Sequence, residues 1–285
     1  MRDYTLRSLC AFVAILGLNA SDSFASAAYD STSLRDERPG QVFSSGSVST
    51  DGNSTGEFKN ISGISTYLSY APKTSNSSTP AILYLTDIFG VQLVNNRLLG
   101  DNLARAGYDV VMPDLFNGVP VPADALTDPN STFNTTAFFA NHTTDMIDAI
   151  VETSINSIRG ELGYSKVAAV GYCFGGRFVA RFLAAGKGLD AGFAAHPSMT
   201  VEAEWQAVAS PLSIAFGALD TANTPAQRAA AEAIFVANNG TFQTALYSDA
   251  EHGFAVRTNL TDPQKAFAQE SAYFQAVRWF DAWVK

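Results

Sequence analysis

The stretch Val170-Gly171-Tyr172-Cys173-Phe174-Gly175-Gly176 constrains the fold of this chain more than any other feature of its sequence. Residues 166–170, mostly small and branched apolar, predict a strand, and residues 177–185 have helical spacing. A cysteine with glycines two positions before and two positions after it, between a strand and a helix, has the layout of a nucleophile elbow. Glycine is favoured there because the turn is strained and the helix packs closely on the strand. The pattern predicts that Cys173 is a nucleophile.

Two later turns carry the side chains that would complete such a site. Asp220 follows a strand predicted at residues 212–216, and His252 follows a strand predicted at residues 242–247. The order of nucleophile, acid and histidine, each after a strand, predicts a Cys173–His252–Asp220 triad. Two alternatives stay open, because an aspartate after a strand is often a turn or helix cap and a free cysteine is often a buried small hydrophobe.

The other two histidines have simpler interpretations. His142 lies inside an Asn-x-Thr triplet on a polar stretch, which predicts a solvated surface residue. His196 follows a strand and is expected to form local hydrogen bonds at the strand end, although it could lie near the site. With three histidines and no metal-ligand spacing, the sequence predicts neither a metal site nor a cofactor.

Strands alternate with helices along most of the chain, which predicts an α/β fold whose mostly parallel sheet has helices on both faces. The domain is expected to span residues 56–285. Residues 114–135 are expected to hold a long loop or a small cap. The last helix is expected to turn an aromatic face inward. The predicted strands are 64–70, 81–85, 108–112, 166–170, 191–195, 212–216 and 242–247, and the predicted helices are 95–106, 137–158, 177–185, 225–238 and 263–284, with Phe267, Phe274, Val277, Phe280 and Trp283 on the inner face of the last one.

The first residues read as a secretory signal peptide. Arg2 and Arg7 precede an apolar run at 9–18 that is too short to span a bilayer, and residues 25–27 offer a small-x-small cleavage site. The prediction is a signal peptide at 1–27 and a flexible leader at 28–55; a membrane anchor is the alternative, but no stop-transfer segment follows. Eight Asn-x-Ser/Thr sequons support export and N-linked glycans, beginning at Asn53, Asn60, Asn76, Asn130, Asn134, Asn141, Asn239 and Asn259.

The net charge and the number of cysteines limit the partners and the disulfides that this protein can have. The net charge of −9 argues against nucleic acid or an anionic membrane surface as a partner. Cys10 lies in the predicted signal peptide, so Cys173 would be the one cysteine of the mature chain. A secreted protein of this kind has no internal disulfide and depends on its core for stability.

Several motifs resemble those of the dienelactone hydrolase family of the α/β-hydrolase superfamily, closer to its eukaryotic branch. They are the elbow at 171–176, Gly217-Ala218-Leu219-Asp220, the run at 252–257, Asp87-Ile88-Phe89-Gly90 and Pro113-Asp114-Leu115-Phe116. The resemblance covers roughly residues 55–285 and implies hydrolysis of a small lactone or ester through an acyl-enzyme, as in a carboxymethylenebutenolidase. It implies Cys173 as nucleophile, His252 as base and then acid, and Asp220 as the orienting carboxylate.

The resemblance also implies residues around the triad. The backbone N–H groups of Ile88 and Phe174 would form the oxyanion hole. Asp87 stands where bacterial members carry a glutamate that touches the resting cysteine. Arg257 lies near the position of one of two arginines that hold the substrate carboxylate, whereas Asn117-Gly118 stands at the other, so a bidentate clamp is lost.

Two readings of a different class remain. A secreted glycoprotein could keep this fold without activity and act as a binding or structural protein, which the changes at Asp87 and Gly118 favour. A redox-sensing thiol protein is the other, and the lack of a resolving cysteine speaks against it.

Overall fold

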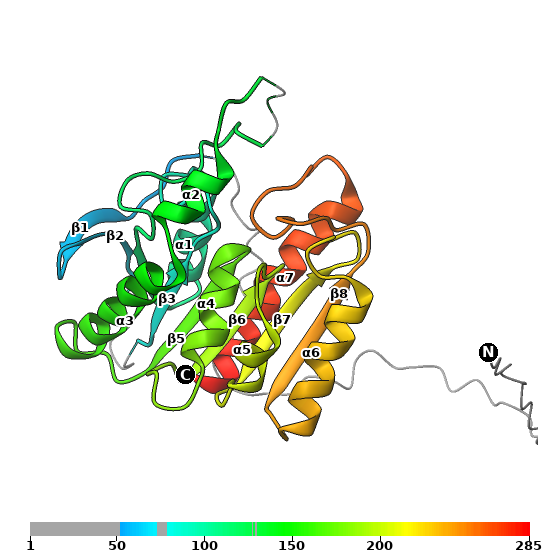
Figure 1. The fold of residues 1–285 in the computed structure, drawn as a ribbon. Coiled ribbons are helices and arrows are strands. Elements are labelled where there is room, and N and C mark those ends of the chain that lie inside the picture. Colours follow the sequence, from blue (N-terminus) through cyan, green and yellow to red (C-terminus); the bar gives the residue numbers. More distant parts are fainter. Residues whose placement is uncertain (1–51, 73–78, 127, 129) are drawn as a thin grey trace, which may run out of the picture. The chain divides into compact units, whose positions relative to one another are not determined.

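The computed structural model describes residues 52–72, 79–126, 128 and 130–285 (Figure 1). All of them belong to one unit of the chain, Gly46–Lys285. The predicted signal peptide and most of the predicted leader lie outside the described residues.

An eight-stranded sheet organises the described residues, with the strand order β1-β2-β4-β3-β5-β6-β7-β8. β2 pairs antiparallel with both β1 and β4, and the remaining neighbours are parallel. The mostly parallel α/β sheet is therefore confirmed. The strands are β1 Glu57–Ile61, β2 Ile64–Ser69, β3 Ala81–Leu85, β4 Asp109–Pro113, β5 Val167–Tyr172, β6 Ala191–Ala195, β7 Leu212–Gly217 and β8 Phe242–Tyr247.

The central strands are continuous apolar runs because both of their faces are covered. In β3, Leu83 and Leu85 pack into one layer, while Ile82 and Tyr84 pack into the opposite one. β1 was not predicted, because it is an edge strand whose residues are exposed except for Ile61. Its sequence therefore lacks the apolar run that marks a central strand.

Helices cover both faces of the sheet (Figure 1). Buried residues of α1 and α7 belong to one apolar layer, and those of α2, α3, α4, α5 and α6 belong to the other. The helices are α1 Val94–Arg105, α2 Thr135–Asn141, α3 Thr144–Gly160, α4 Phe174–Phe182, α5 Glu202–Gln206, α6 Pro225–Ala237 and α7 Pro263–Trp283. Among the described residues, no helix has the length and apolarity needed to cross a bilayer.

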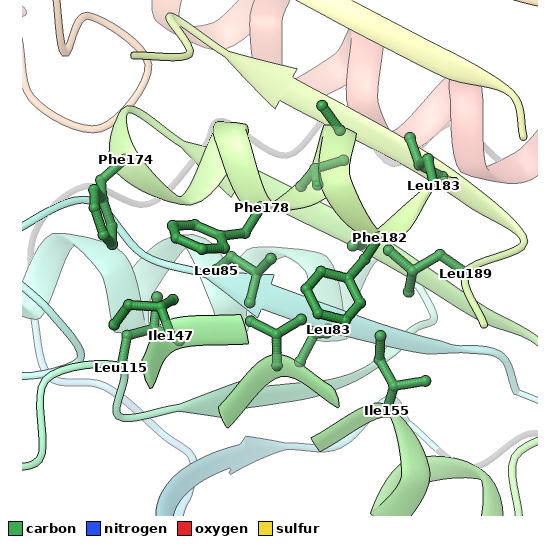
Figure 2. Packing of buried hydrophobic residues seen from close by; sticks show 14 of the residues in the cluster. Leu83, Leu85, Leu115, Ile147, Ile155, Phe174, Phe178, Phe182, Leu183 and Leu189 are labelled. Atoms are coloured by element: carbon green, nitrogen blue, oxygen red, sulfur yellow. The ribbon is translucent and has the colours of Figure 1, made fainter. Parts of the chain in front are cut away.

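Helix α4, which follows the predicted nucleophile, is fixed by a row of phenylalanines. Phe174, Phe178 and Phe182 are four residues apart and share one face of the helix. Figure 2 shows this row packed among apolar residues of β3 and α3, including Leu83, Leu85, Ile147 and Ile155. All three rings are almost completely buried. Their burial anchors the first turn of α4, and with it the position of Cys173.

Two helix predictions need correction. The helix expected at 137–158 is two helices, because the chain breaks at His142 and the Thr143 side chain caps α3 by accepting from the Met146 N–H group. In α7, Phe267, Phe274 and Trp283 are exposed rather than inward. Phe280 lies inward as predicted and Val277 is partly buried against the same layer, but the rest of the inner face carries Ala268, Ala272, Tyr273 and Ala276. Alanines four residues apart let α7 approach the sheet closely, and three of the large side chains predicted for this face lie outside it.

Candidate active site

Cys173 occupies a strained turn between β5 and α4. Its φ of 52° and ψ of −113° are unusual for a residue with a side chain. The flanking glycines are required by close packing: a Cβ atom on Gly171 would lie 2.5 Å from the Gly175 oxygen, and one on Gly175 would lie 2.1 Å from the Leu85 oxygen. The local geometry is that of a nucleophile elbow, with cysteine at its tip.

The strained backbone of Cys173 is held by the chain that follows β6. The Cys173 N–H group donates to the Ala195 oxygen at 3.1 Å and to His196 Nδ1 at 3.2 Å. The Cys173 oxygen accepts from the N–H groups of Ser198 at 3.0 Å and Gly176 at 3.1 Å. These bonds stabilise a conformation that the isolated turn would not adopt.

The three side chains of the predicted triad lie together. His252 Nε2 is 3.0 Å from the Cys173 Sγ atom, and His252 Nδ1 is 3.0 Å and 3.1 Å from the two carboxylate oxygens of Asp220. The Asp220 side chain is fully buried, whereas the His252 side chain is 32% exposed. One ring nitrogen thus faces the sulfur and the other faces a buried carboxylate, as a nucleophile, a base and an orienting acid require.

Asp220 is fixed by donors from its own turn. Ala222 N–H donates to Oδ1 at 2.8 Å and Asn223 Nδ2 donates to Oδ2 at 3.0 Å. Burial opposes the charged form of Asp220, but the hydrogen bonds and charge of His252, with these donors, hold the pKa of this carboxyl below its usual value. The Asp220 carboxylate that contacts His252 is therefore negatively charged at neutral pH.

The charge on His252 follows from its two neighbours. Burial lowers the pKa of His252, but the hydrogen bonds to Asp220 and Cys173 outweigh burial and raise this pKa to about 10. The imidazole is then protonated at neutral pH, with its positive charge 3.0 Å from the sulfur. A cation next to a cysteine favours the thiolate, which is the nucleophilic form of a cysteine.

The two backbone N–H groups that were predicted to form the oxyanion hole have no hydrogen-bond acceptor within the described residues. Within the part of the chain that the structure describes, neither Ile88 nor Phe174 donates its N–H group in a hydrogen bond. Phe174 begins α4, where the helix dipole is positive. Ile88 is half-buried and packs, like Cys173, against the apolar cluster that contains Phe174. The two predicted oxyanion donors are therefore unpaired.

Asp87 lies in a buried network rather than at an open surface. Its Oδ1 atom accepts from Asn96 Nδ2 at 2.9 Å and from Phe89 N–H at 3.1 Å. Burial raises the pKa of Asp87 despite these donors. Arg257 Nη2 is 3.9 Å from Asp87 Oδ2, and the guanidinium lies 3.8 Å from the centre of the Phe89 ring. The Arg257 side chain is 36% exposed, so its charge is accessible.

The predicted surface position of His142 is wrong. His142 is buried, with Nδ1 2.9 Å from the Phe138 oxygen and Nε2 3.2 Å from the Phe116 oxygen. It joins α2 to the chain after β4, which a polar local sequence could not reveal. His196 Nδ1 accepts a hydrogen bond from the N–H group of Cys173, 23 residues earlier, rather than a local one, and the His196 ring centre is 5.2 Å from that of His252, so this residue lies at the site.

The sequence did not single out three polar residues of the site. Ser198 contacts Cys173, Asn223 holds Asp220 and Asn96 holds Asp87. Within the described ranges, no group of three or more His, Cys, Asp or Glu side chains is placed to hold a metal ion.

The burial of His196 predicts a pH dependence of stability. Complete burial, with the nearby charge of His252, lowers the pKa of His196 to about 3 from 6.5. The unfolded chain then binds a proton below pH 6.5 that the folded chain does not bind until about pH 3. Protonation therefore favours unfolding, and His196 should subtract about 1.4 kcal/mol from the free energy of unfolding for each pH unit below 6.5.

Urea denaturation of the wild type and His196→Asn at several pH values between 6.5 and 4.5 measures this effect. Asparagine keeps an acceptor near the Cys173 N–H group but does not titrate. The difference in stability between the two proteins should narrow as the pH falls. Parallel curves would contradict the buried neutral state of His196.

An α/β sheet with a nucleophile elbow after β5, an acid after β7 and a histidine after β8 defines an enzyme of the α/β-hydrolase class. Residues 64–284 match the dienelactone hydrolase family, and the chain belongs to that family. The predictions of the family and of a hydrolase acting on ester or lactone bonds are thereby confirmed.

Individual relatives agree with this assignment. The chain is 39% identical to "Hydrolase pyvD" of Aspergillus violaceofuscus over 87% of this chain and 98% of that protein. It is 32% identical to "Dienlactone hydrolase 1" of Gibberella moniliformis over 82% of this chain and 90% of that protein. Among solved structures, the dienelactone hydrolase-like promiscuous phosphotriesterase P91 from metagenomic libraries shares the fold, with a TM-score of 0.63 and 17% identity over 81% of this chain and 99% of that chain.

Proposed function

We propose that this protein is a secreted cysteine hydrolase that cleaves small lactones or esters through a covalent acyl-enzyme, with Cys173, His252 and Asp220 as its triad. The observation that carries the proposal is the chain of contacts from Sγ through the imidazole to the carboxylate, at 3.0 Å for each step. The depressed pKa of Asp220 and the raised pKa of His252 support it, because they favour an imidazolium next to the sulfur.

In the first half of the reaction, the Cys173 thiolate attacks the carbonyl carbon of the substrate. The carbonyl oxygen becomes an oxyanion, which the free N–H groups of Ile88 and Phe174 would bind. When the carbon–oxygen bond to the leaving group breaks, the Nε2–H group of His252 donates its proton to the departing oxygen. The products are a thioester on Cys173 and an alcohol; a lactone gives the hydroxyl end of the same molecule.

In the second half, neutral His252 takes a proton from water. The resulting hydroxide attacks the thioester carbon, the same two N–H groups bind the new oxyanion, and the carbon–sulfur bond breaks. The thiolate and the imidazolium are restored together, and the acid is released. Asp220 keeps its charge throughout and orients the imidazole, while its own position is fixed by Asn223.

Substrate binding is proposed to use Arg257 and Asp87. The exposed face of the Arg257 guanidinium would meet an anionic or carbonyl group of the substrate, while Asp87 and the Phe89 ring hold the guanidinium in place. With one accessible arginine rather than a pair, the site should accept neutral esters as well as anionic lactones.

Steady-state turnover of p-nitrophenyl acetate, a neutral lactone and a simple anilide by the wild type tests the reaction class. The thiolate adds to the carbonyl carbon, and the resulting tetrahedral intermediate loses an oxygen leaving group far more readily than an amide nitrogen. The ester and the lactone should therefore be cleaved, and the anilide should not. Faster cleavage of the anilide would contradict the proposed chemistry. Absence of turnover on every ester and lactone would favour the inactive binding protein.

Secretion and N-linked glycosylation are part of the proposal. The sequon asparagines within the described residues are all exposed: Asn53, Asn60, Asn130, Asn134, Asn141, Asn239 and Asn259. Expression of the full chain in a eukaryotic host should place the protein in the medium, with a mass that falls on treatment with peptide N-glycosidase. Retention in the cells without a change of mass would contradict this part of the proposal.

A further inference from the structure

The segment between β6 and α5 brings a second polar side chain to the sulfur of Cys173. Ser198 Oγ lies 3.6 Å from the Cys173 Sγ atom, within hydrogen-bonding distance for sulfur. Within the described residues, the Ser198 hydroxyl has no other hydrogen bond. His252 approaches the same sulfur at 3.0 Å from the loop after β8. Two side chains from different loops thus converge on the reacting atom.

The position of Ser198 is strongly determined by its surroundings. Its N–H group donates to the Cys173 oxygen at 3.0 Å, and the preceding Pro197 oxygen accepts from Asn223 Nδ2 at 2.7 Å. On the other side, the Val201 N–H group donates at 3.0 Å to Glu204, which also binds Arg177 of α4. The segment is therefore tied to the elbow, to the Asp220 turn and to α4.

Backbone strain in the same segment supports a functional role. His196 has a φ of 39° and Met199 a φ of 60°, and neither is a glycine. Left-handed conformations of such residues are costly and persist where the surroundings enforce them, commonly at active sites. Here the strain turns the chain so that both the N–H group and the hydroxyl of Ser198 reach Cys173.

We propose that Ser198 is a further catalytic residue, whose hydroxyl donates a hydrogen bond to the Cys173 thiolate in the resting enzyme. The inference rests on the proposed role of Cys173 as the nucleophile. With His252 protonated, the thiolate accepts from two donors, the His252 Nε2–H group and the Ser198 O–H group. When the sulfur attacks, its negative charge moves to the substrate oxygen and the hydrogen bond from Ser198 weakens. The Ser198 hydroxyl therefore increases the fraction of Cys173 that is thiolate and does not stabilise the oxyanion.

Several titratable groups surround the pair and bear on its pH dependence. His252 and Asp220 lie on one side, after β8 and β7. His196 lies on the segment that also carries Ser198, and its lowered pKa keeps it neutral above about pH 3. Asp87 interacts electrostatically with His252, and Arg257 interacts electrostatically with His196. Removal of the Ser198 hydroxyl leaves all of these groups in place, so its effect on the thiolate can be isolated.

The pH dependence of alkylation by iodoacetamide, followed on the Cys173 peptide by mass spectrometry, tests the proposal. Ser198→Ala should move the acid limb of this profile to higher pH by about half to one pH unit, because the thiolate loses a donor. The alkylation rate should then fall roughly three- to tenfold on the acid limb, while the rate on the alkaline plateau should not fall. Ser198→Thr keeps a hydroxyl and should restore the wild-type profile.

Thr200→Val is the matched control. Thr200 lies on the same segment, and its buried hydroxyl has no hydrogen-bond partner within the described residues, so its loss should leave the profile unchanged. A Ser198→Ala profile that overlays that of the wild type would overturn the role of Ser198. Slow alkylation of the wild type at every pH would instead contradict Cys173 as an activated thiol, so the two failures are distinguishable.

Discussion

Cys173→Ala is expected to reduce kcat/KM for p-nitrophenyl acetate by about 10⁴-fold or more, to the level left by the oxyanion hole and substrate binding alone. The reason is that the substitution removes the atom that forms the thioester. Alanine still leaves the backbone bonds of residue 173 to Ala195, His196 and Ser198 available. The thermal midpoint should therefore change by only a few degrees, which circular dichroism measures on the same sample.

The control for Cys173→Ala is a measurement of whether the variant is folded. A folded Cys173→Ala protein without hydrolysis assigns the loss to chemistry. A folded variant that keeps hydrolysis would show that another group attacks the substrate, and the proposed triad would then be wrong. An unfolded variant is not expected, because Cys173 is only partly buried.

Gly175→Ala is expected to have the largest effect on folding. An added Cβ atom would lie 2.1 Å from the Leu85 oxygen, 2.5 Å from the Leu85 carbonyl carbon and 2.7 Å from the Thr86 oxygen. All three are backbone atoms, so no side-chain rotation can relieve the overlap, and α4 must move away from β3. The free energy of unfolding should fall by about 3 kcal/mol or more, which urea denaturation measures.

Gly160→Ala provides the matched control. Gly160 ends α3, and an added Cβ atom would meet nothing within 4 Å. Because alanine favours a helix more than glycine does, this substitution should be neutral or stabilise the protein by up to about 1 kcal/mol. Equal effects of the two substitutions would contradict the close approach of α4 to β3 at the elbow.

The helices and strands that could be predicted are those whose pattern of apolar and polar residues agrees with their burial in the folded protein. The strands at 81–85, 191–195 and 242–247 have the predicted bounds because each is a short, mostly apolar run between turns. Most of the inner face of α7 could not be predicted from hydrophobicity, although Phe280 was. A helix that lies close to a sheet has room for alanine but not for phenylalanine at most contact positions. The distance between helix and sheet depends on the packing of all the side chains between them, which a local sequence does not show.

The same limit applies to the site. The positions of Cys173, Asp220 and His252 at three strand ends were predictable, because the carboxyl ends of parallel strands meet at one edge of a sheet. Ser198 was not predictable, because its role depends on how a strained segment bends back to the elbow. Nor was the burial of His142, which depends on carbonyl groups of Phe116 and Phe138 that converge only in the folded chain.

Trapping of the acyl-enzyme tests the central role of Cys173 most directly. The protein is mixed with excess p-nitrophenyl acetate, quenched in acid within the first turnovers and digested for peptide mass spectrometry. The proposed mechanism predicts a burst of p-nitrophenol and an acetyl group on the peptide that contains Cys173, labile to hydroxylamine. An acetyl group on Ser198, or turnover without any acylated peptide, would contradict it.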